Sequence, residues 1–298
     1  MTILAAPVQQ ASRLANRAKR EAMFRVPPVR RLAEGRHQRL VRRHADSLPT
    51  LQAGDRAIID QVRGEGVYRT SMDELALPGS AAVQQRLGEL VEKLAATPTT
   101  SSAIRTPHED LLADLSVWHF GLNDRLLDIV ENYLGVPARY YGADIRREVA
   151  DGIPDDVRQW HRDIEDHRML KVLVWLNDVD ADGGPFAYLP RALSAQTMDR
   201  LHYVGGFISD DKLRAVVPEA EWQLATGPKW TTVIPDTSQV LHRATPPTAR
   251  DRYSVTFSYT SRRPINTRPA KPFTADEIRR IRTGLSERQL ACLPRTAS

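Results

Sequence analysis

The spacing of apolar and polar residues changes near the middle of the 298-residue chain. In the first half, apolar residues recur every three to four positions, which is typical of amphipathic helices. This spacing predicts helices over 6–24, 28–46, 52–64, 80–96 and 121–134. Pro27 and Pro28 separate the first two, because proline interrupts a helix, and Ser80 is a suitable N-cap. Residues 98–107 are predicted to form a polar loop.

The second half contains short segments of β-branched and aromatic residues separated by turn residues. These segments predict strands over 138–149, 169–179, 185–190, 229–236 and 252–260. A mostly helical insertion is expected over 192–225, and a last helix over 274–290. Helices followed by a strand-rich half are typical of an antiparallel β-core backed by helices. We therefore expect a mainly β fold with flanking helices.

The positive charge is concentrated at the start of the chain. The net charge is +5, but residues 1–50 contain eleven Lys and Arg against three acidic residues. We interpret 1–50 as a basic helical extension, 51–263 as one domain and 264–298 as a helical tail. An organelle-targeting presequence or a patch for an anionic partner are alternatives for the extension. Stacking on nucleic-acid bases needs aromatic rings, and the extension contains only Phe24, which argues against nucleic acid as the partner.

The bulk composition fits a soluble globular protein with a sizeable core, since 41% of residues are hydrophobic and 27% are charged. No segment approaches the roughly 18 consecutive apolar residues that span a bilayer. Cys292 is the one cysteine, so the chain forms no internal disulfide. We expect a cytoplasmic protein that binds a small molecule and does not bind nucleic acid or span a membrane. The oligomeric state is left open.

The pattern His-x-Asp occurs at His44–Asp46, His108–Asp110 and His161–Asp163. Residues two apart share a face of an extended strand but lie on nearly opposite faces of a helix, so only an extended pair can bind one ion. The first two pairs lie in helical segments. His161 and Asp163 precede the apolar run 169–179, which is predicted to be a strand. This pair is therefore the candidate for a metal site.

A third ligand is available at His242, in an apolar segment that follows a turn. In the next strand, alternation places Arg252 and Ser254 on one face, where they suit a carboxylate. Two histidines and one carboxylate leave three positions open on an octahedral metal, as in non-haem Fe(II) oxygenases. A keto acid would take two of these positions, and dioxygen would take the third.

These motifs, with the segment "DADGGPFAYLP" between them, resemble the phytanoyl-CoA dioxygenase family of Fe(II)/2-oxoglutarate oxygenases. The resemblance covers about residues 138–262 and implies a double-stranded β-helix (jelly-roll) core. It implies that His161, Asp163 and His242 bind iron. Arg252, assisted by Ser254, would bind the distal carboxylate of 2-oxoglutarate. Members convert 2-oxoglutarate and dioxygen to succinate and CO2 while they oxidise a second substrate, usually by hydroxylation.

The carboxylate at position 163 bears on the reaction type. Related halogenases have Ala or Gly there, so Asp163 favours hydroxylation of a small or medium organic molecule, such as a secondary metabolite. Desaturation, ring formation and epimerisation stay open. Two other classes also stay open: a zinc hydrolase, because zinc accepts the same ligands, and a non-catalytic β-barrel binding protein.

Other polar or aromatic residues near these motifs are candidates for binding. Lys171 interrupts an apolar strand and needs an anionic partner, which is either 2-oxoglutarate or one of Glu165 and Asp166. The candidates for substrate binding, each of which also suits a packing or surface role, are Tyr141, Arg146, Trp160, Arg162 and His167.

Overall fold

The chain folds into two antiparallel β-sheets with helices around them in the computed structural model, which describes residues 26–266 and 274–293. The larger sheet has the order β1-β7-β4-β9-β3-β2, with β1 at Val67–Ser71, β7 at Thr231–Pro235, β4 at Leu170–Trp175, β9 at Arg252–Ser261, β3 at Ala138–Glu148 and β2 at Ala103–Arg105. The smaller sheet has the order β6-β5-β8, with β6 at Gln223–Ala225, β5 at Phe186–Tyr188 and β8 at His242–Ala244. All pairings between these strands are antiparallel.

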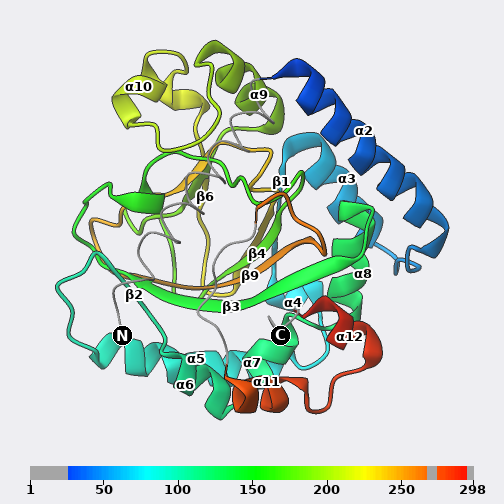
Figure 1. Cartoon of the computed structure of the whole chain (residues 1–298). Helices are drawn as coiled ribbons and strands as arrows, with labels where there is room; N and C mark the ends of the chain where they lie inside the picture. Colours follow the sequence, from blue (N-terminus) through cyan, green and yellow to red (C-terminus); the bar gives the residue numbers. More distant parts are fainter. Residues whose placement is uncertain (1–25, 267–273, 294–298) are drawn as a thin grey trace, which may run out of the picture.

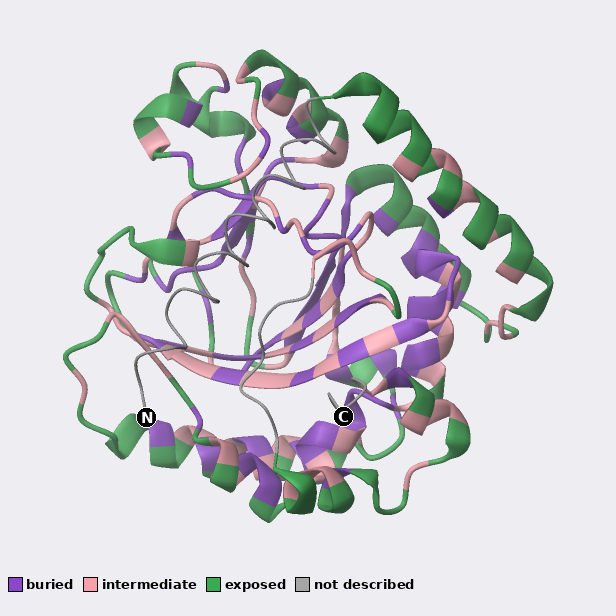
Figure 2. Ribbon diagram, viewed as in Figure 1, coloured by how far each residue is buried: buried purple, intermediate pink, exposed green. Residues whose placement is uncertain are grey.

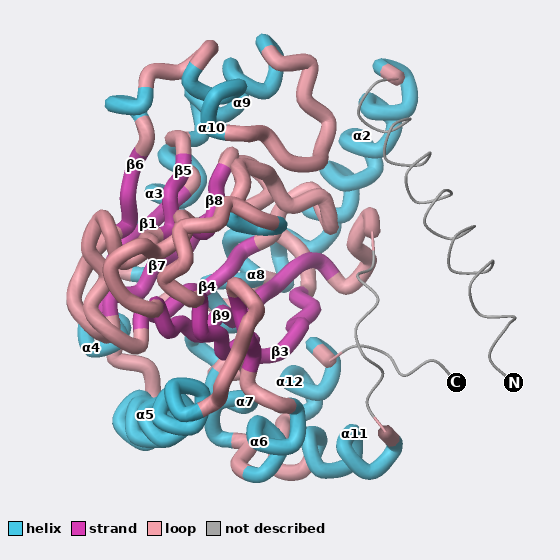
Figure 3. The backbone as a smooth tube through the Cα atoms, turned by 90° about the vertical axis from the view of Figure 1, so that its left-hand side faces the viewer, coloured by secondary structure: helices cyan, strands magenta, loops and turns pink. Residues whose placement is uncertain are grey.

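Helices contain more of the described residues than strands, so the fold is mixed rather than mainly β as predicted. The α-helices are α2 (Pro27–His44), α3 (Asp55–Glu65), α4 (Met72–Leu75), α5 (Ser80–Ala96), α6 (His108–Ala113), α7 (Ser116–Phe120), α8 (Asp124–Leu134), α9 (Arg191–Arg200), α10 (Asp210–Arg214), α11 (Ala275–Arg282) and α12 (Glu287–Cys292). Short 3₁₀ helices are η1 (Ala45–Ser47), η2 (Asp156–Arg158) and η3 (Glu219–Glu221). Helices α5 to α7 lie at one end of the molecule and α9 and α10 at the other, with the strands between them (Figures 1 and 3).

The main hydrophobic core lies between the larger sheet and helices α5, α7 and α8. Apolar residues at alternate positions of β4 and β9 point into it, including Val172, Val255 and Phe257. The helices contribute one buried stripe each, as amphipathic helices do, and Figure 2 shows these inward-facing stripes as buried. The opposite face of the sheet carries polar side chains, mainly on β9 and β3, together with Leu173 and Trp175 of β4, and it lines the cavity described below.

Most predicted elements are present, with shifted ends. The predicted helices over 28–46, 52–64 and 80–96 correspond to α2, α3 and α5, whereas the helix over 6–24 lies outside the described residues. The prediction of Ser80 as a cap is wrong, because Gly79 is the N-cap and the Ser80 hydroxyl donates to the carbonyl of Leu77. The helix predicted over 121–134 is α8, which begins at Asp124 and ends at Leu134, with Gly135 as its C-cap.

Three predictions missed short elements. The polar loop 98–107 contains β2, and the helical insertion 192–225 contains β6. The last helix is two helices, α11 and α12, which are separated at Gly284 and begin at the capping residues Thr274 and Ser286. Strands of three residues carry too little alternation to be recognised, because they are stabilised by pairing with a neighbouring strand. None of the helices in the described segments has the length and apolar composition needed to cross a bilayer.

Candidate metal centre

His161 and His242 lie directly opposite each other on two neighbouring extended segments, where they form an antiparallel bridge. The backbone amide of His161 donates to the carbonyl of His242 at 2.9 Å, and the reverse bond is 2.8 Å. The next residue but one, Asp163, donates its amide to Thr237 at 2.8 Å, so this segment stays extended and the side chains at 161 and 163 share a face. One nitrogen from each histidine and one oxygen of Asp163 lie within 4.8 Å of one another, and all three residues are buried.

Backbone carbonyls orient both imidazoles. Nδ1 of His161 lies 2.8 Å from the carbonyl of Gln159, and Nδ1 of His242 lies 3.1 Å from that of Val240. A carbonyl only accepts hydrogen bonds, so in the neutral form of each ring Nδ1 carries the proton and Nε2 offers its lone pair. Fixing the tautomer through the second ring nitrogen is the usual support of a metal-binding histidine.

Burial keeps His242 in the form that binds metal. Burial lowers the pKa of His242 well below its ordinary value, and the charge of His161 lowers it further, while Asp163 opposes both effects. The imidazole of His242 is therefore neutral at physiological pH. A neutral imidazole is the ligand form of histidine. The donor set and its protonation fit a divalent transition metal.

Lys171 forms an ion pair with Asp163, a partner that the sequence analysis did not name. Its Nζ lies 2.5 Å from Oδ2 of Asp163, and the two side chains are 15% and 2% exposed. Lys171 reaches this position because its strand, β4, presents Lys171, Leu173 and Trp175 to the cavity. A buried carboxylate is stable only when paired, so the ammonium neutralises Asp163 in the metal-free protein.

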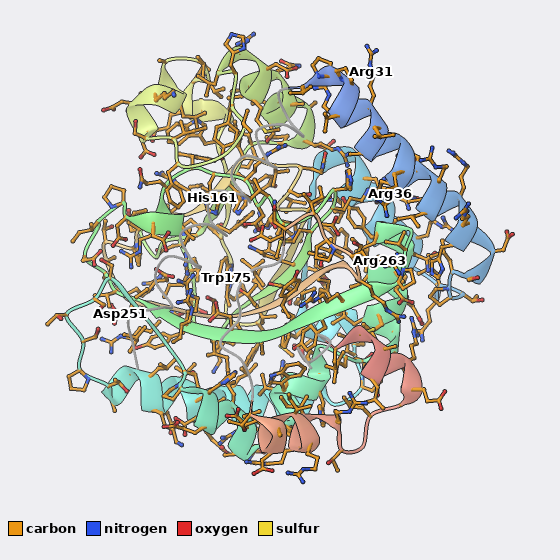
Figure 4. All side chains as sticks on the ribbon, viewed as in Figure 1. Arg31, Arg36, His161, Trp175, Asp251 and Arg263 are labelled. Atoms are coloured by element: carbon orange, nitrogen blue, oxygen red, sulfur yellow. The ribbon has the colours of Figure 1, made fainter. Side chains whose placement is uncertain are left out.

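The three candidate ligands line a cavity of about 130 Å³ between the two sheets. The larger sheet contributes the polar face of β9, where Arg252, Ser254, Thr256 and Ser258 point inward as strand alternation predicts. His161 and Trp175 lie on the side of the larger sheet that faces away from α5 and α7 (Figure 4). The candidate metal ligands and the candidate anion clamp therefore share one cavity.

Arg252 is held by several contacts at one end of this cavity. Its guanidinium donates to the carbonyl of Gly184, lies over the ring of Trp175 at 5.4 Å and lies 3.8 Å from Oε1 of Glu148. Gly184 has φ +74°, and a Cβ there would lie 2.6 Å from the carbonyl oxygen of Thr245, so only glycine fits. The carbonyl of Gly184 thus helps to position Arg252.

The remaining predicted residues are distributed over three places. Arg146 lines the cavity. Tyr141 lies on the same face of β3, because a β-bulge between Tyr140 and Ala143 shifts the alternation, and its hydroxyl lies 3.3 Å from that of Thr260. Trp160 is fully buried, packs against Trp222 and donates to Asp210, away from the cavity lining.

Arg162 and His167 line a second cavity, of about 330 Å³, between α2 and the segment 162–168. Asp163 lines both cavities. Helix α2 contacts this segment through His37, whose ring stacks on that of His167 at 4.3 Å, and through Glu34, whose carboxylate lies 3.5 Å from Nδ1 of His167. The described part of the basic extension therefore lines a cavity next to the candidate metal centre.

Sequence analysis did not identify Glu148 and Arg158. Glu148 is 1% exposed and pairs with Arg158 at 2.8 Å and with Arg146 at 3.4 Å. Burial alone would raise the pKa of Glu148, but Arg252, Arg146 and Arg158 hold it below its ordinary value. The signal was present in β3, where charged residues stand at alternate positions, at Asp144, Arg146 and Glu148.

Comparison with solved structures finds HygX, ThoJ and SnoN among those that resemble this chain. HygX from Streptomyces hygroscopicus, solved with nickel and 2-oxoglutarate bound, is 16% identical with a TM-score of 0.50, covering 72% of this chain and 88% of HygX. ThoJ, a non-heme monooxygenase, is 15% identical with a TM-score of 0.48, covering 79% and 97%. The epimerase SnoN, solved with Fe3+, alpha ketoglutarate and nogalamycin RO, is 16% identical with a TM-score of 0.48, covering 74% and 93%.

The likeness to HygX is one of fold. No protein-family model matches this chain, and no curated protein matches it. Membership of the phytanoyl-CoA dioxygenase family therefore stays a prediction from the motifs.

Proposed function

We propose that this chain is an Fe(II)- and 2-oxoglutarate-dependent oxygenase that hydroxylates a small or medium organic molecule. The observation that carries the proposal is the convergence of His161, Asp163 and His242 in a cavity that Arg252 also lines. Two imidazoles and one carboxylate are the donor set of non-haem Fe(II) oxygenases. A zinc hydrolase would leave the buried arginine without a role. The fold shared with HygX, which was solved with nickel and 2-oxoglutarate, supports the proposal.

Each residue has one task in this proposal. His161 and His242 would donate their Nε2 lone pairs to Fe(II), and Asp163 would supply the anionic ligand. When bound, the iron supplies activation of dioxygen coupled to oxidative decarboxylation of 2-oxoglutarate to succinate and CO2. Arg252 and Ser254 would bind the distal carboxylate. Lys171, whose ammonium group already lies beside Asp163, would contact the co-substrate near the metal.

We further assign the two sheets to a double-stranded β-helix of the phytanoyl-CoA dioxygenase type, spanning residues 51–263 between the basic extension and the helical tail. A polar cavity between two antiparallel sheets, with helices on the outer face of the larger one, supports this assignment. Because Asp163 keeps the carboxylate that halogenases lack, hydroxylation is the reaction that we propose. The cytoplasmic location is part of the same proposal.

The test is aerobic incubation of the full chain with Fe(II), ascorbate and 2-oxoglutarate, followed by quantification of succinate. An oxygenase forms succinate slowly even without its second substrate, and substitution of zinc for iron abolishes the reaction. The proposal is wrong if the folded, iron-loaded protein binds 2-oxoglutarate but forms no succinate in this incubation. A hydrolase would instead cleave ester substrates in the zinc form without consuming dioxygen.

A further inference from the structure

Strands β3 and β9 bring a cluster of charged side chains to one end of the cavity. In the register of this pair, Glu148 lies opposite Arg252 and Arg146 lies opposite Ser254. Directly paired residues of antiparallel strands project on the same face, so Arg146 stands beside the clamp formed by Arg252 and Ser254. Arg158 approaches Glu148 from η2.

Among the buried side chains of the cluster, guanidinium groups outnumber carboxylates. Three guanidinium groups, those of Arg146, Arg158 and Arg252, surround the single carboxylate of Glu148. Their side chains are 16%, 2% and 5% exposed. Arg158 is satisfied, because it binds Oε2 of Glu148 at 2.8 Å and Asp151 at 2.6 Å. Arg146 has one further carboxylate, that of the part-exposed Asp144, at 3.8 Å, whereas Glu148 is the acidic partner of Arg252 among the described residues.

Arg146 and Arg252 are only loosely held by Glu148. They lie 3.4 and 3.8 Å from the same atom, Oε1, which has no hydrogen-bond partner in the part of the chain that the structure describes. The Nε groups of both arginines are likewise buried without a hydrogen bond to a described residue. Burial lowers the pKa of Arg252 to about 10, with Glu148 acting in the opposite direction. Two buried guanidinium groups with such long contacts to one carboxylate can accommodate a further anion.

We propose that Arg146 is a second guanidinium for the distal carboxylate of the co-substrate, and that Glu148 is a positioning residue that holds Arg146 and Arg252 side by side. This inference rests on the proposed function and replaces the substrate role that the sequence suggested for Arg146. Two guanidinium groups on one carboxylate provide paired hydrogen bonds and charge. The site then selects keto acids with a terminal carboxylate over those without one.

The experiment compares two ligands that share the keto-acid head. Binding of 2-oxoglutarate and of 2-oxopentanoate, which lacks the distal carboxylate, is measured by calorimetry on the nickel-loaded full chain without oxygen. Arg146→Gln is expected to weaken 2-oxoglutarate about 10- to 100-fold and to leave 2-oxopentanoate within about twofold. Arg146→Lys should lie between wild type and Arg146→Gln, because it keeps the charge but not the paired geometry.

The role of Glu148 is tested by the ratio of the affinities for 2-oxoglutarate and 2-oxopentanoate. Glu148→Gln is expected to weaken 2-oxoglutarate about tenfold, with part of the loss restored in Glu148→Asp, whereas a structural role alone would change both ligands equally. Arg147→Gln is the matched control, since Arg147 lies on the opposite face of β3, is ion-paired with Asp251 and does not line the cavity. Retained binding of 2-oxopentanoate shows that a variant is folded with its metal centre intact.

The outcomes separate this inference from the proposed function. Failure of the wild-type protein to bind 2-oxoglutarate with nickel would overturn both. If the wild-type protein binds 2-oxoglutarate but Arg146→Gln and Arg146→Lys both bind it as tightly as Arg147→Gln does, the proposed role of Arg146 is wrong. The oxygenase proposal is unaffected by that result. Equal loss of both keto acids in Glu148→Gln would overturn the positioning role of Glu148.

Discussion

His161 and His242 exchange two backbone hydrogen bonds, of 2.9 and 2.8 Å, although a large part of the chain separates them. This pair joins the segment after η2 to the edge of the smaller sheet beside β8. The imidazoles lie 4.4 Å apart between ring centroids, and each is oriented by a carbonyl of its own segment. Backbone pairing, rather than side-chain contacts alone, therefore sets the distance between the two candidate ligands.

Removal of the carboxylate at position 163 should weaken metal binding. Of the three candidate ligands, Asp163 is the anionic one. Loss of a residue that only supports a metal ligand typically lowers metal affinity by about 10-fold or more, so Asp163→Ala, which removes a ligand itself, is expected to lower the affinity for Mn(II) by more than about 10-fold. Calorimetry measures this affinity, and succinate formation should disappear in parallel. Asp166→Asn is the control, because Asp166 accepts from the amide of Ser261 and should leave the affinity unchanged.

Replacement of Arg252 should act on the co-substrate rather than on the metal. Arg252→Gln removes a buried guanidinium that lines the cavity, and we expect the KM for 2-oxoglutarate to rise at least about tenfold. The affinity for Mn(II) in the absence of 2-oxoglutarate should change little. A variant with unchanged KM would show that the anion clamp lies elsewhere.

Lys171 should matter most when no metal is bound. Lys171→Met removes the ammonium group from a buried ion pair with Asp163, and breaking a buried ion pair typically costs about 3–5 kcal/mol. The metal-free variant should therefore unfold at lower urea concentration than the wild type. A divalent metal should restore much of the difference, because it neutralises the same carboxylate. Equal losses of stability with and without metal would argue against this relationship.

The stability of the metal-free protein should fall as the pH drops below 6.5, partly through His37. Burial lowers the pKa of His37 from 6.5, and His167 lowers it further, while Asp166 and Glu34 oppose this shift. As the pH falls, the unfolded chain therefore binds this proton at a higher pH than the folded chain does. The contribution of His37 to the free energy of unfolding is fully present above pH 6.5 and is lost as the pH falls toward the folded-state pKa. Urea unfolding of His37→Gln between about pH 5 and 8 should show a smaller loss than wild type. Identical pH profiles would contradict this.

Tyr133 should contribute to stability through a buried hydrogen bond. Its hydroxyl donates to the carboxylate of Asp236, which is fully buried at the end of β7 and also accepts from Ser238 and Met169. Tyr133→Phe is expected to lower the free energy of unfolding by about 1–3 kcal/mol. Urea unfolding measures the change, and Tyr68→Phe, which removes a hydroxyl that bonds to no described residue, should be close to neutral.

Local pattern alone determined much of the fold and part of the site. Periodicity located the helices α2, α3, α5 and α8, because an amphipathic stripe is a property of one segment. Alternation placed Arg252, Ser254, Thr256 and Ser258 on one face of β9, and they do line the cavity. The spacing His161-x-Asp163 required an extended segment, which the backbone hydrogen bonds of these residues provide.

Only the tertiary structure decided which of these faces meet. The register of β3 against β9 sets Glu148 opposite Arg252, and a bulge in β3 returns Tyr141 to the face of Arg146. The pairing of His161 with His242 and the position of α2 against His167 are likewise contacts between distant segments. A segment encodes which of its faces is polar, but the partner of that face depends on how all elements pack, because pairing and burial stabilise it jointly.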